Sequence, residues 1–172
     1  EGGGARVVYL TPSGRLWSQA LAEEAARESQ IVLLCGRYEG IDQRIVDAFV
    51  TDEISVGDYV LAGGEVAAMV LVDTVVRLVE GGIKAQSLAE ESFRRGLLEY
   101  PQYTRPALFG GRGVPEILTS GDHDAVRRWR LRESLRRTLE RRPDLLERRP
   151  FSPEEARLLN DVMDERAAHE GE

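Results

Sequence analysis

Apolar and polar positions follow two different periodic patterns over the first 80 residues. Short β-branched or apolar segments alternate with longer stretches whose apolar side chains suit one face of a helix. This alternation predicts an α/β layer built on a parallel sheet. The expected strands are residues 6–11, 31–35 and 53–56, and the expected helices are residues 17–28, 41–49 and 66–79.

The pattern changes from residue 97 onward. Prolines and glycines give an irregular path as far as Pro115, and three helices are expected after it. The first is capped by Asp122 or Asp124 and ends near residue 142, before Pro143, and a short helix covers residues 144–148. The third begins at Ser152-Pro153-Glu154-Glu155, because serine can cap, proline suits the first helical position and a glutamate follows three residues after the cap.

These patterns predict two domains joined by a linker. Residues 1–80 form the α/β domain, residues 81–96 show no clear period and are interpreted as an interdomain linker, and residues 97–172 form a small helical domain.

Residues 55–65 read Ser-Val-Gly-Asp-Tyr-Val-Leu-Ala-Gly-Gly-Glu, which indicates a strand end, a glycine-rich loop and a helix start. Glycine has no side chain, so backbone groups of such a loop can approach a flat polar ligand such as a nucleobase. Residues 10–13 and 36–40 also follow strands, and ligands of open α/β sheets gather at the carboxyl ends of strands. The alternative is a tight connection whose glycines serve only for turning.

Composition narrows the class of protein. The single cysteine, Cys35, excludes an internal disulfide and suits a reducing compartment. The longest apolar run, residues 66–72, stops at Asp73, well short of a membrane span, so we expect a cytoplasmic protein. Neither His123 nor His169 has partners at metal-ligand spacing, so no metal site is expected.

Although the net charge of the chain is −7, one segment is basic. Residues 127–149 contain ten arginines and four acidic residues, so this window carries +6 and the remainder −13. On a helix, four arginines share one face while Leu131, Leu135 and Leu139 line another. Guanidinium groups grouped in this way favour contact with the phosphates of a nucleic acid, RNA or DNA. The alternative is a solvated helix in which Glu133 pairs with nearby arginines. The four are Arg127, Arg130, Arg137 and Arg141.

Several multi-residue motifs resemble the bacterial tRNA (guanine-N1)-methyltransferase family, of the SPOUT or α/β-knot class. The resemblance runs from about Ala5 to the C-terminal helices, and the family's N-terminal segment has no counterpart here. Together with the absence of an initial methionine, this predicts that an N-terminal portion is missing. The motifs are Leu10-Thr11-Pro12-Ser13-Gly14, Cys35-Gly36-Arg37-Tyr38-Glu39-Gly40-Ile41-Asp42, Gly57-Asp58-Tyr59-Val60-Leu61-Ala62-Gly63-Gly64-Glu65, Tyr103-Thr104-Arg105-Pro106 and Arg127-Arg128-Trp129-Arg130.

The resemblance implies a parallel sheet with a deep trefoil knot, which binds S-adenosylmethionine in a bent shape, and a small C-terminal helical domain. It also implies a homodimer whose active site lies between subunits, with the helix of residues 66–79 in the interface. Carried over residue by residue, it assigns cofactor binding to Leu10, Gly36, Val56, Gly57, Asp58, Tyr59, Val60, Leu61, Gly63 and Gly64.

The implied reaction is methyl transfer from S-adenosylmethionine to N1 of the guanosine 3′ to the tRNA anticodon. Glu91 stands at the position of the family's catalytic base, with Glu90 as a rival, and Arg77 matches the arginine credited with charge stabilisation. Glu39 matches a residue near the target guanine, and the arginine face of residues 127–141 would grip the anticodon arm.

Two other classes remain open at this point. A non-catalytic RNA- or DNA-binding protein could use the basic helix and keep the α/β layer as a scaffold. A Rossmann-type methyltransferase is disfavoured, because the glycine-rich first turn of that fold is absent.

Overall fold

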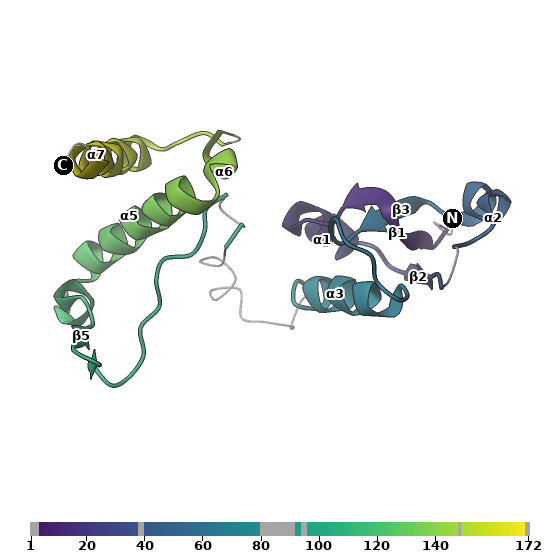
Figure 1. Cartoon of the computed structure of the whole chain (residues 1–172), viewed down its shortest axis with the longest axis horizontal. Coiled ribbons are helices and arrows are strands. Elements are labelled where there is room, and N and C mark those ends of the chain that lie inside the picture. The colour runs from purple at the N-terminus through teal and green to yellow at the C-terminus, as the bar shows by residue number, and fades with distance from the viewer. Residues whose placement is uncertain (1–3, 38–39, 80–91, 94–95, 148, 171–172) are drawn as a thin grey trace. The chain divides into compact units, whose positions relative to one another are not determined.

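The computed structural model describes residues 4–37, 40–79, 92–93, 96–147 and 149–170 (Figure 1). The chain divides into two compact units, Glu1–Ala85 and Gln86–Glu172. Most of the expected linker, residues 81–96, lies outside the described residues, so its assignment stays a prediction.

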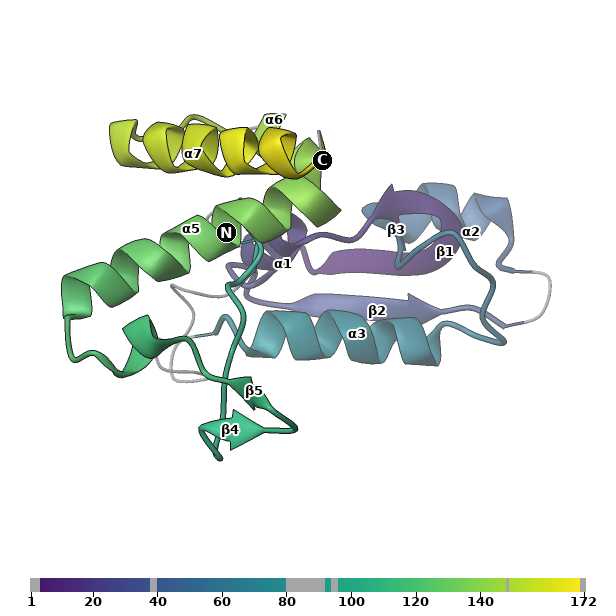
Figure 2. The same ribbon diagram turned by 60° about the vertical axis from the view of Figure 1, so that its left-hand side comes forward.

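The first unit is built on a three-stranded parallel sheet, which confirms the predicted α/β class. The strands lie in the order β2-β1-β3, with β1 in the centre (Figures 1 and 2). Because β1 is central, the chain moves to one side of it for β2 and back to the other side for β3, which makes the end of β1 a switch point. The strands are β1 Arg6–Leu16, β2 Ile31–Cys35 and β3 Asp52–Ser55, and the helices are α1 Gln19–Ala25, α2 Gln43–Phe49 and α3 Glu65–Val76.

The first strand is longer than the sequence indicates. We expected a turn at Pro12-Ser13-Gly14, but β1 continues to Leu16, with an irregularity between Leu10 and Arg15. Both of those residues pair with Ile54 of β3. Gly14 therefore lies against the backbone of β3, where a Cβ would come 2.6 Å from the carbonyl carbon of Ile54.

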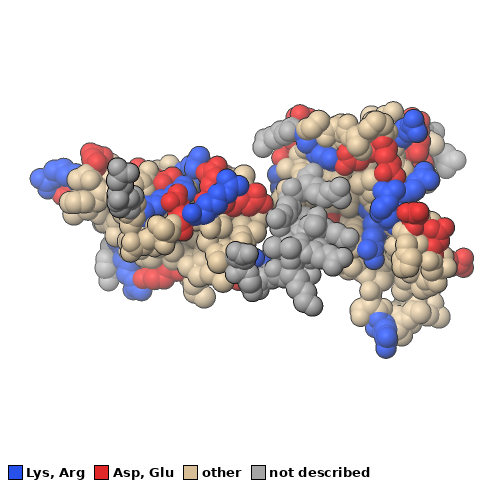
Figure 3. Space-filling view, turned by 180° about the vertical axis from the view of Figure 1, so that it is seen from behind, with Lys and Arg blue, Asp and Glu red and all other residues tan. Residues whose placement is uncertain are grey.

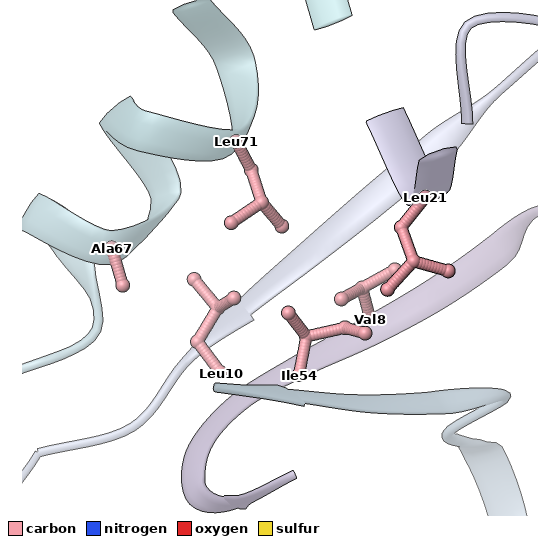
Figure 4. Close-up of a cluster of buried hydrophobic side chains, with 6 residues drawn as sticks. All are labelled: Val8, Leu10, Leu21, Ile54, Ala67 and Leu71. Carbon is pink, nitrogen blue, oxygen red and sulfur yellow. The ribbon is translucent and has the colours of Figure 1, made fainter. Parts of the chain in front are cut away.

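The core of this unit lies between the sheet and two helices. Val8, Leu10 and Ile54 of the strands meet Leu21 of α1 and two residues of α3, as Figure 4 shows. Trp17, just after β1, donates an indole hydrogen bond of 2.9 Å to Thr74 of α3. This packing fixes α3 across the sheet, with its first turn at the carboxyl ends of the strands. The α3 residues in the cluster are Ala67 and Leu71.

The second unit confirms the three predicted helices. Asp122 caps the first by accepting a hydrogen bond of 3.0 Å from the Ala125 amide. Ser152 and Glu155 form the predicted reciprocal cap, since each side chain accepts from the other's amide, at 2.8 and 3.2 Å. Leu135, fully buried, centres a core to which Leu131 and Leu139 contribute. The helices are α5 His123–Arg141, α6 Pro143–Glu147 and α7 Pro153–Glu170.

The path before these helices is more regular than predicted. It contains an antiparallel hairpin of β4 Leu108–Phe109 and β5 Arg112–Gly113, followed by a 3-10 turn, η1 Glu116–Thr119. Gly110 and Gly111 at its tip have φ of 55° and 78°, as a tight two-residue hairpin turn requires. Among the described residues, no helix is long and apolar enough to cross a membrane.

An ion pair joins the beginnings of β1 and β3, and it predicts how stability depends on pH. Arg6 donates to both carboxylate oxygens of Asp52, at 2.9 and 3.0 Å. The Arg6 guanidinium lowers the pKa of Asp52 below its ordinary value. Because the folded-state pKa is the lower one, the pair stabilises the fold above about pH 4, the unfolded value, and this contribution is lost as the pH falls through the lowered pKa.

Asp52→Asn is therefore expected to lower the free energy of unfolding by about 1–2 kcal/mol at neutral pH and to weaken its dependence on pH in acid. Urea unfolding at a series of pH values from neutral to strongly acidic measures both effects. Glu53→Gln, an exposed neighbour on the same strand, is the matched control and should change neither. An Asp52→Asn protein with unaltered acid dependence would contradict the assignment.

Candidate functional site

A cavity of about 230 Å³ lies at the carboxyl ends of the three parallel strands. Its walls come from the loops after β1, β2 and β3 and from the first turn of α3. Asp58, which the resemblance assigns to cofactor binding, does not line it. The other nine residues of that assignment do: Leu10, Gly36, Val56, Gly57, Tyr59, Val60, Leu61, Gly63 and Gly64.

The second and third loops are held together by their backbones. The Gly64 amide donates to the Gly36 carbonyl at 3.0 Å, and Arg37 and Gly63 form an isolated antiparallel bridge. A Cβ on Gly64 would lie 2.9 Å from the Cα of Cys35, closer than side-chain carbons approach backbone. Gly64 is thus required for the close approach of the loops after β2 and β3. These two loops form part of the cavity wall.

Gly57 has a different role, in the turn after β3. Its φ is 152°, and a Cβ there would overlap the ring of Tyr59. The Tyr59 hydroxyl donates back to the Val56 carbonyl at 3.1 Å, and the Gly57 amide donates to the Ser55 hydroxyl at 3.2 Å. The need to form this turn therefore accounts for Gly57. For this residue, the alternative interpretation applies, in which a glycine of the loop serves only for turning.

The charges around the cavity are paired with each other. Arg37 donates to Glu65 at 2.7 Å, and this hydrogen bond lowers the pKa of the Glu65 carboxyl. Burial, and then the negative charge of Glu65, raise the pKa of the Cys35 thiol. A neutral thiol at the end of β2 is a packing residue rather than a nucleophile.

An exposed apolar stripe runs along α3 on the side away from the core. Val66, Met69, Val70 and Val76 are between 42% and 70% exposed, and the helical period places Arg77 on the same side. Exposed apolar side chains gathered on one side of a helix make this side a candidate interaction surface. Arg77 follows the last residue of α3, about 18 Å along the axis from the first turn that lines the cavity.

Two predicted residues cannot be placed. Glu91, assigned as base, and Glu39, assigned to the guanine, lie outside the described residues, as does Glu90. Within the described part of the chain, no group of three or more His, Cys, Asp or Glu residues is arranged to hold a metal ion.

The arginines of α5 are largely paired with carboxylates of α7. Arg127 donates twice to Glu154, at 3.0 and 2.9 Å, and Arg136 pairs with Glu165 at 2.7 Å and Glu133 at 2.7 Å. In Figure 3, blue and red side chains accordingly lie intermixed over the helices of this unit. Ion pairing, the alternative considered for this helix, is therefore extensive, but most partners come from α7.

Three of the four arginines on the predicted face interact with other residues of the second unit. Besides the Arg127 pair, Arg130 lies over the ring of Tyr100, 4.8 Å from its centroid, and Arg137 donates to the Glu99 carbonyl at 3.2 Å. Only Arg141 of the four is exposed without a hydrogen bond or ion pair to the described residues. A phosphate contact along this whole face would have to compete with these partners.

A parallel α/β layer with a glycine-bounded cavity at its strand ends, followed by an arginine-rich helical unit, defines an α/β protein with a candidate ligand cavity and a helical unit. The sequence comparisons narrow this class. The chain belongs to the tRNA (guanine-1)-methyltransferase family, since the model described as tRNA (Guanine-1)-methyltransferase TrmD matches residues 2–148.

Similar proteins bear the name tRNA (guanine-N(1)-)-methyltransferase. One from Caldicellulosiruptor saccharolyticus is 53% identical over 90% of this chain and 63% of its own length. One from Symbiobacterium thermophilum is 58% identical over 90% of this chain and 62% of its own length. One from Pseudomonas fluorescens is 52% identical over 96% of this chain and 66% of its own length. The chain thus spans about two thirds or less of the length of these relatives.

Proposed function

We propose that this protein transfers a methyl group from S-adenosylmethionine to N1 of the guanosine 3′ to the anticodon of tRNA. The observation that carries the proposal is the cavity at the strand ends, which gathers nine of the ten residues assigned to cofactor binding from three separate loops. Membership of the family and the names of its relatives agree with this activity.

The cavity suits the adenosine part of such a cofactor. Among the described residues, its lining offers backbone groups, the rings of Tyr9 and Tyr59 and aliphatic side chains, and it includes Arg37 but no acidic residue. A Cβ on Gly36 would lie 3.2 Å from the ring of Tyr9, and both residues line the cavity. When bound, the cofactor supplies a methyl group already activated by its sulfonium. The deep trefoil knot is part of the same proposal, and the backbone contact of the second and third loops supports it.

The remaining chemistry falls to side chains of this chain. Guanine N1 carries a proton whose pKa is well above neutral, so a base must remove it before N1 can attack. We assign this to Glu91, with Glu90 as the rival, and place Glu39 near the guanine. Negative charge then spreads onto O6, where the Arg77 guanidinium would stabilise it.

These assignments require two copies of the chain. Arg77 lies about 15 Å along α3 from Ala67, the last α3 residue that lines the cavity, which is beyond the reach of an arginine side chain of the same chain. A second copy packed on the exposed stripe of α3 could bring its Arg77 to this cavity, and burial of the stripe would stabilise the pair. The proposed catalytic role of Arg77 therefore depends on the proposed homodimer.

The test is methyl transfer by the full-length protein to anticodon-arm transcripts, with labelled S-adenosylmethionine. Label should enter the transcript that carries guanosine 3′ to the anticodon, and nuclease digestion should release it as N1-methylguanosine. A transcript with adenosine at that position should remain unlabelled. RNA binding without any heat of binding for S-adenosylmethionine in calorimetry would instead indicate the non-catalytic nucleic-acid-binding alternative.

A further inference from the structure

The segment of residues 100–115 differs in charge from the rest of this acidic chain. It contains two arginines, Arg105 and Arg112, and no acidic residue, although the protein has 30 acidic residues among 172. It also contributes three aromatic side chains. Both arginines are exposed, and neither forms a hydrogen bond or ion pair with the residues that the structure describes. The aromatic residues are Tyr100, Tyr103 and Phe109.

Part of this segment borders a hollow of about 490 Å³. Tyr100, Tyr103 and Arg105 line it together with Arg130 of α5, and none of the described residues that line it is acidic. The ring of Tyr103 lies 6.4 Å from that of Trp129, tilted by 51°, and remains 47% exposed. The wall of the hollow thus includes both the exposed ring of Tyr103 and the guanidinium group of Arg105.

The β4–β5 hairpin presents a second aromatic ring beside a cation. Phe109 and Arg112 face each other across the two strands, and the Val114 amide closes the hairpin onto the Ala107 carbonyl at 3.0 Å. Phe109 is 77% exposed and Leu108 66% exposed. In Figure 3 the end of the unit that carries this hairpin is mostly tan, with blue at its tip. A ring this exposed on a short hairpin contributes nothing to the core of the unit.

We infer that the hollow and the hairpin together form an acid-free surface that binds unpaired nucleotides of the tRNA substrate. Exposed rings stack on bases that are not stacked in a duplex. Arg105 and Arg112, which form no hydrogen bond or ion pair with the described residues, are available to phosphates. This inference rests on the proposed function for the identity of the RNA. It places the main contact at residues 100–115 rather than along α5, where carboxylates of α7 already engage the guanidinium groups.

Stacking is tested by varying Phe109 alone. Fluorescence anisotropy should compare an anticodon stem–loop with a fully paired duplex of equal length, without cofactor. Phe109→Leu keeps an apolar side chain but removes the ring, and should weaken binding of the stem–loop about tenfold while leaving the duplex unchanged. Phe109→Trp should retain the affinity of the unaltered protein, since a larger ring stacks as well.

Phosphate contact is tested by the salt dependence of stem–loop binding. Arg112→Gln should lower the slope of log affinity against log salt by about 0.7, the value for one contact to a single strand. Arg157→Gln is the matched control, since Arg157 is an exposed arginine of α7 with no hydrogen bond or ion pair to the described residues. It removes the same charge from the same unit and should leave the slope unchanged.

Two results would overturn the inference: unchanged stem–loop binding by Phe109→Leu, or equal losses for Arg112→Gln and Arg157→Gln. Circular dichroism and thermal unfolding verify that each variant is folded. We expect each to fold, because the replaced side chains are exposed. Failure of the proposed function is a separate result, because it would leave these binding differences intact and abolish only methyl transfer.

Discussion

Gly14→Ala is expected to lower the free energy of unfolding of the first unit by about 3–5 kcal/mol, at the upper end of single substitutions. The added Cβ would lie 2.5 Å from the carbonyl carbon of Glu53 and 2.6 Å from that of Ile54. These are backbone atoms of β3, so no side-chain rotation relieves the overlap. Ile54 is 1% exposed and packs in the core, and β3 can move away only if that core opens.

Urea unfolding followed by circular dichroism measures this loss. Gly4→Ala is the matched control, because a Cβ on Gly4 meets nothing within 4 Å, and its effect should stay within about 0.5 kcal/mol. If the two substitutions had similar small effects, the close approach of β1 to β3 would be wrong. Because the irregular part of β1 also supplies Thr11 and Pro12 to the cavity, we expect Gly14→Ala to weaken S-adenosylmethionine binding as well.

The second large effect is expected at Arg77. Arg77→Ala should lower kcat by about 100- to 1,000-fold, the usual loss when one group that stabilises developing negative charge is removed. The affinity for S-adenosylmethionine in calorimetry should stay within about twofold, since Arg77 lies about 15 Å along α3 from Ala67, the last α3 residue that lines the cavity of its own chain. Arg44→Ala, which removes an exposed arginine from α2, is the control and should change neither quantity.

Mixed dimers of two inactive variants distinguish an active site shared between two chains from one formed within a single chain. Gly64→Val should prevent cofactor binding, because its side chain would meet the backbone at Cys35. If Arg77 serves the cavity of the other copy, mixed dimers of Arg77→Ala and Gly64→Val contain one site with neither change. Random re-association of the two inactive proteins should then restore up to about a quarter of the activity.

Absence of any restored activity, with dimer exchange verified by size and labelling, would place Arg77 and the cavity in the same chain. A parallel loss of cofactor affinity and kcat in Arg77→Ala would instead indicate that the substitution damages α3.

Local signals in the sequence predicted local structure well. The Ser152–Glu155 cap was predicted because both partners lie within one helical turn, and the structure has both hydrogen bonds. The leucine face of α5 follows from its period, and Leu135 is fully buried there. The three parallel strands were recognised from their residue types, and the cavity at their ends follows from the direction of the strands.

Long-range partners could not be predicted in the same way. The Arg127–Glu154 pair spans 27 positions, and only the packing of α5 against α7 brings the two side chains together. The continuation of β1 past Pro12 depends on Ile54, which pairs with two separate residues of that strand. The β4–β5 hairpin did have a local signal, the pair Gly110-Gly111 between apolar and basic residues, which we interpreted only as irregular chain.

The pairing of α5 with α7 has a consequence for encounters in solution. Opposite charges that lie beside each other cancel within a short distance, so most of α5 exerts little pull on a distant polyanion. Arg105 and Arg112, whose guanidinium groups form no ion pair with the described residues, should then dominate the field at their end of the unit. An approaching RNA would be turned toward that end before it touches the protein, so this arrangement should govern how fast productive collisions occur and how strongly their rate depends on ionic strength.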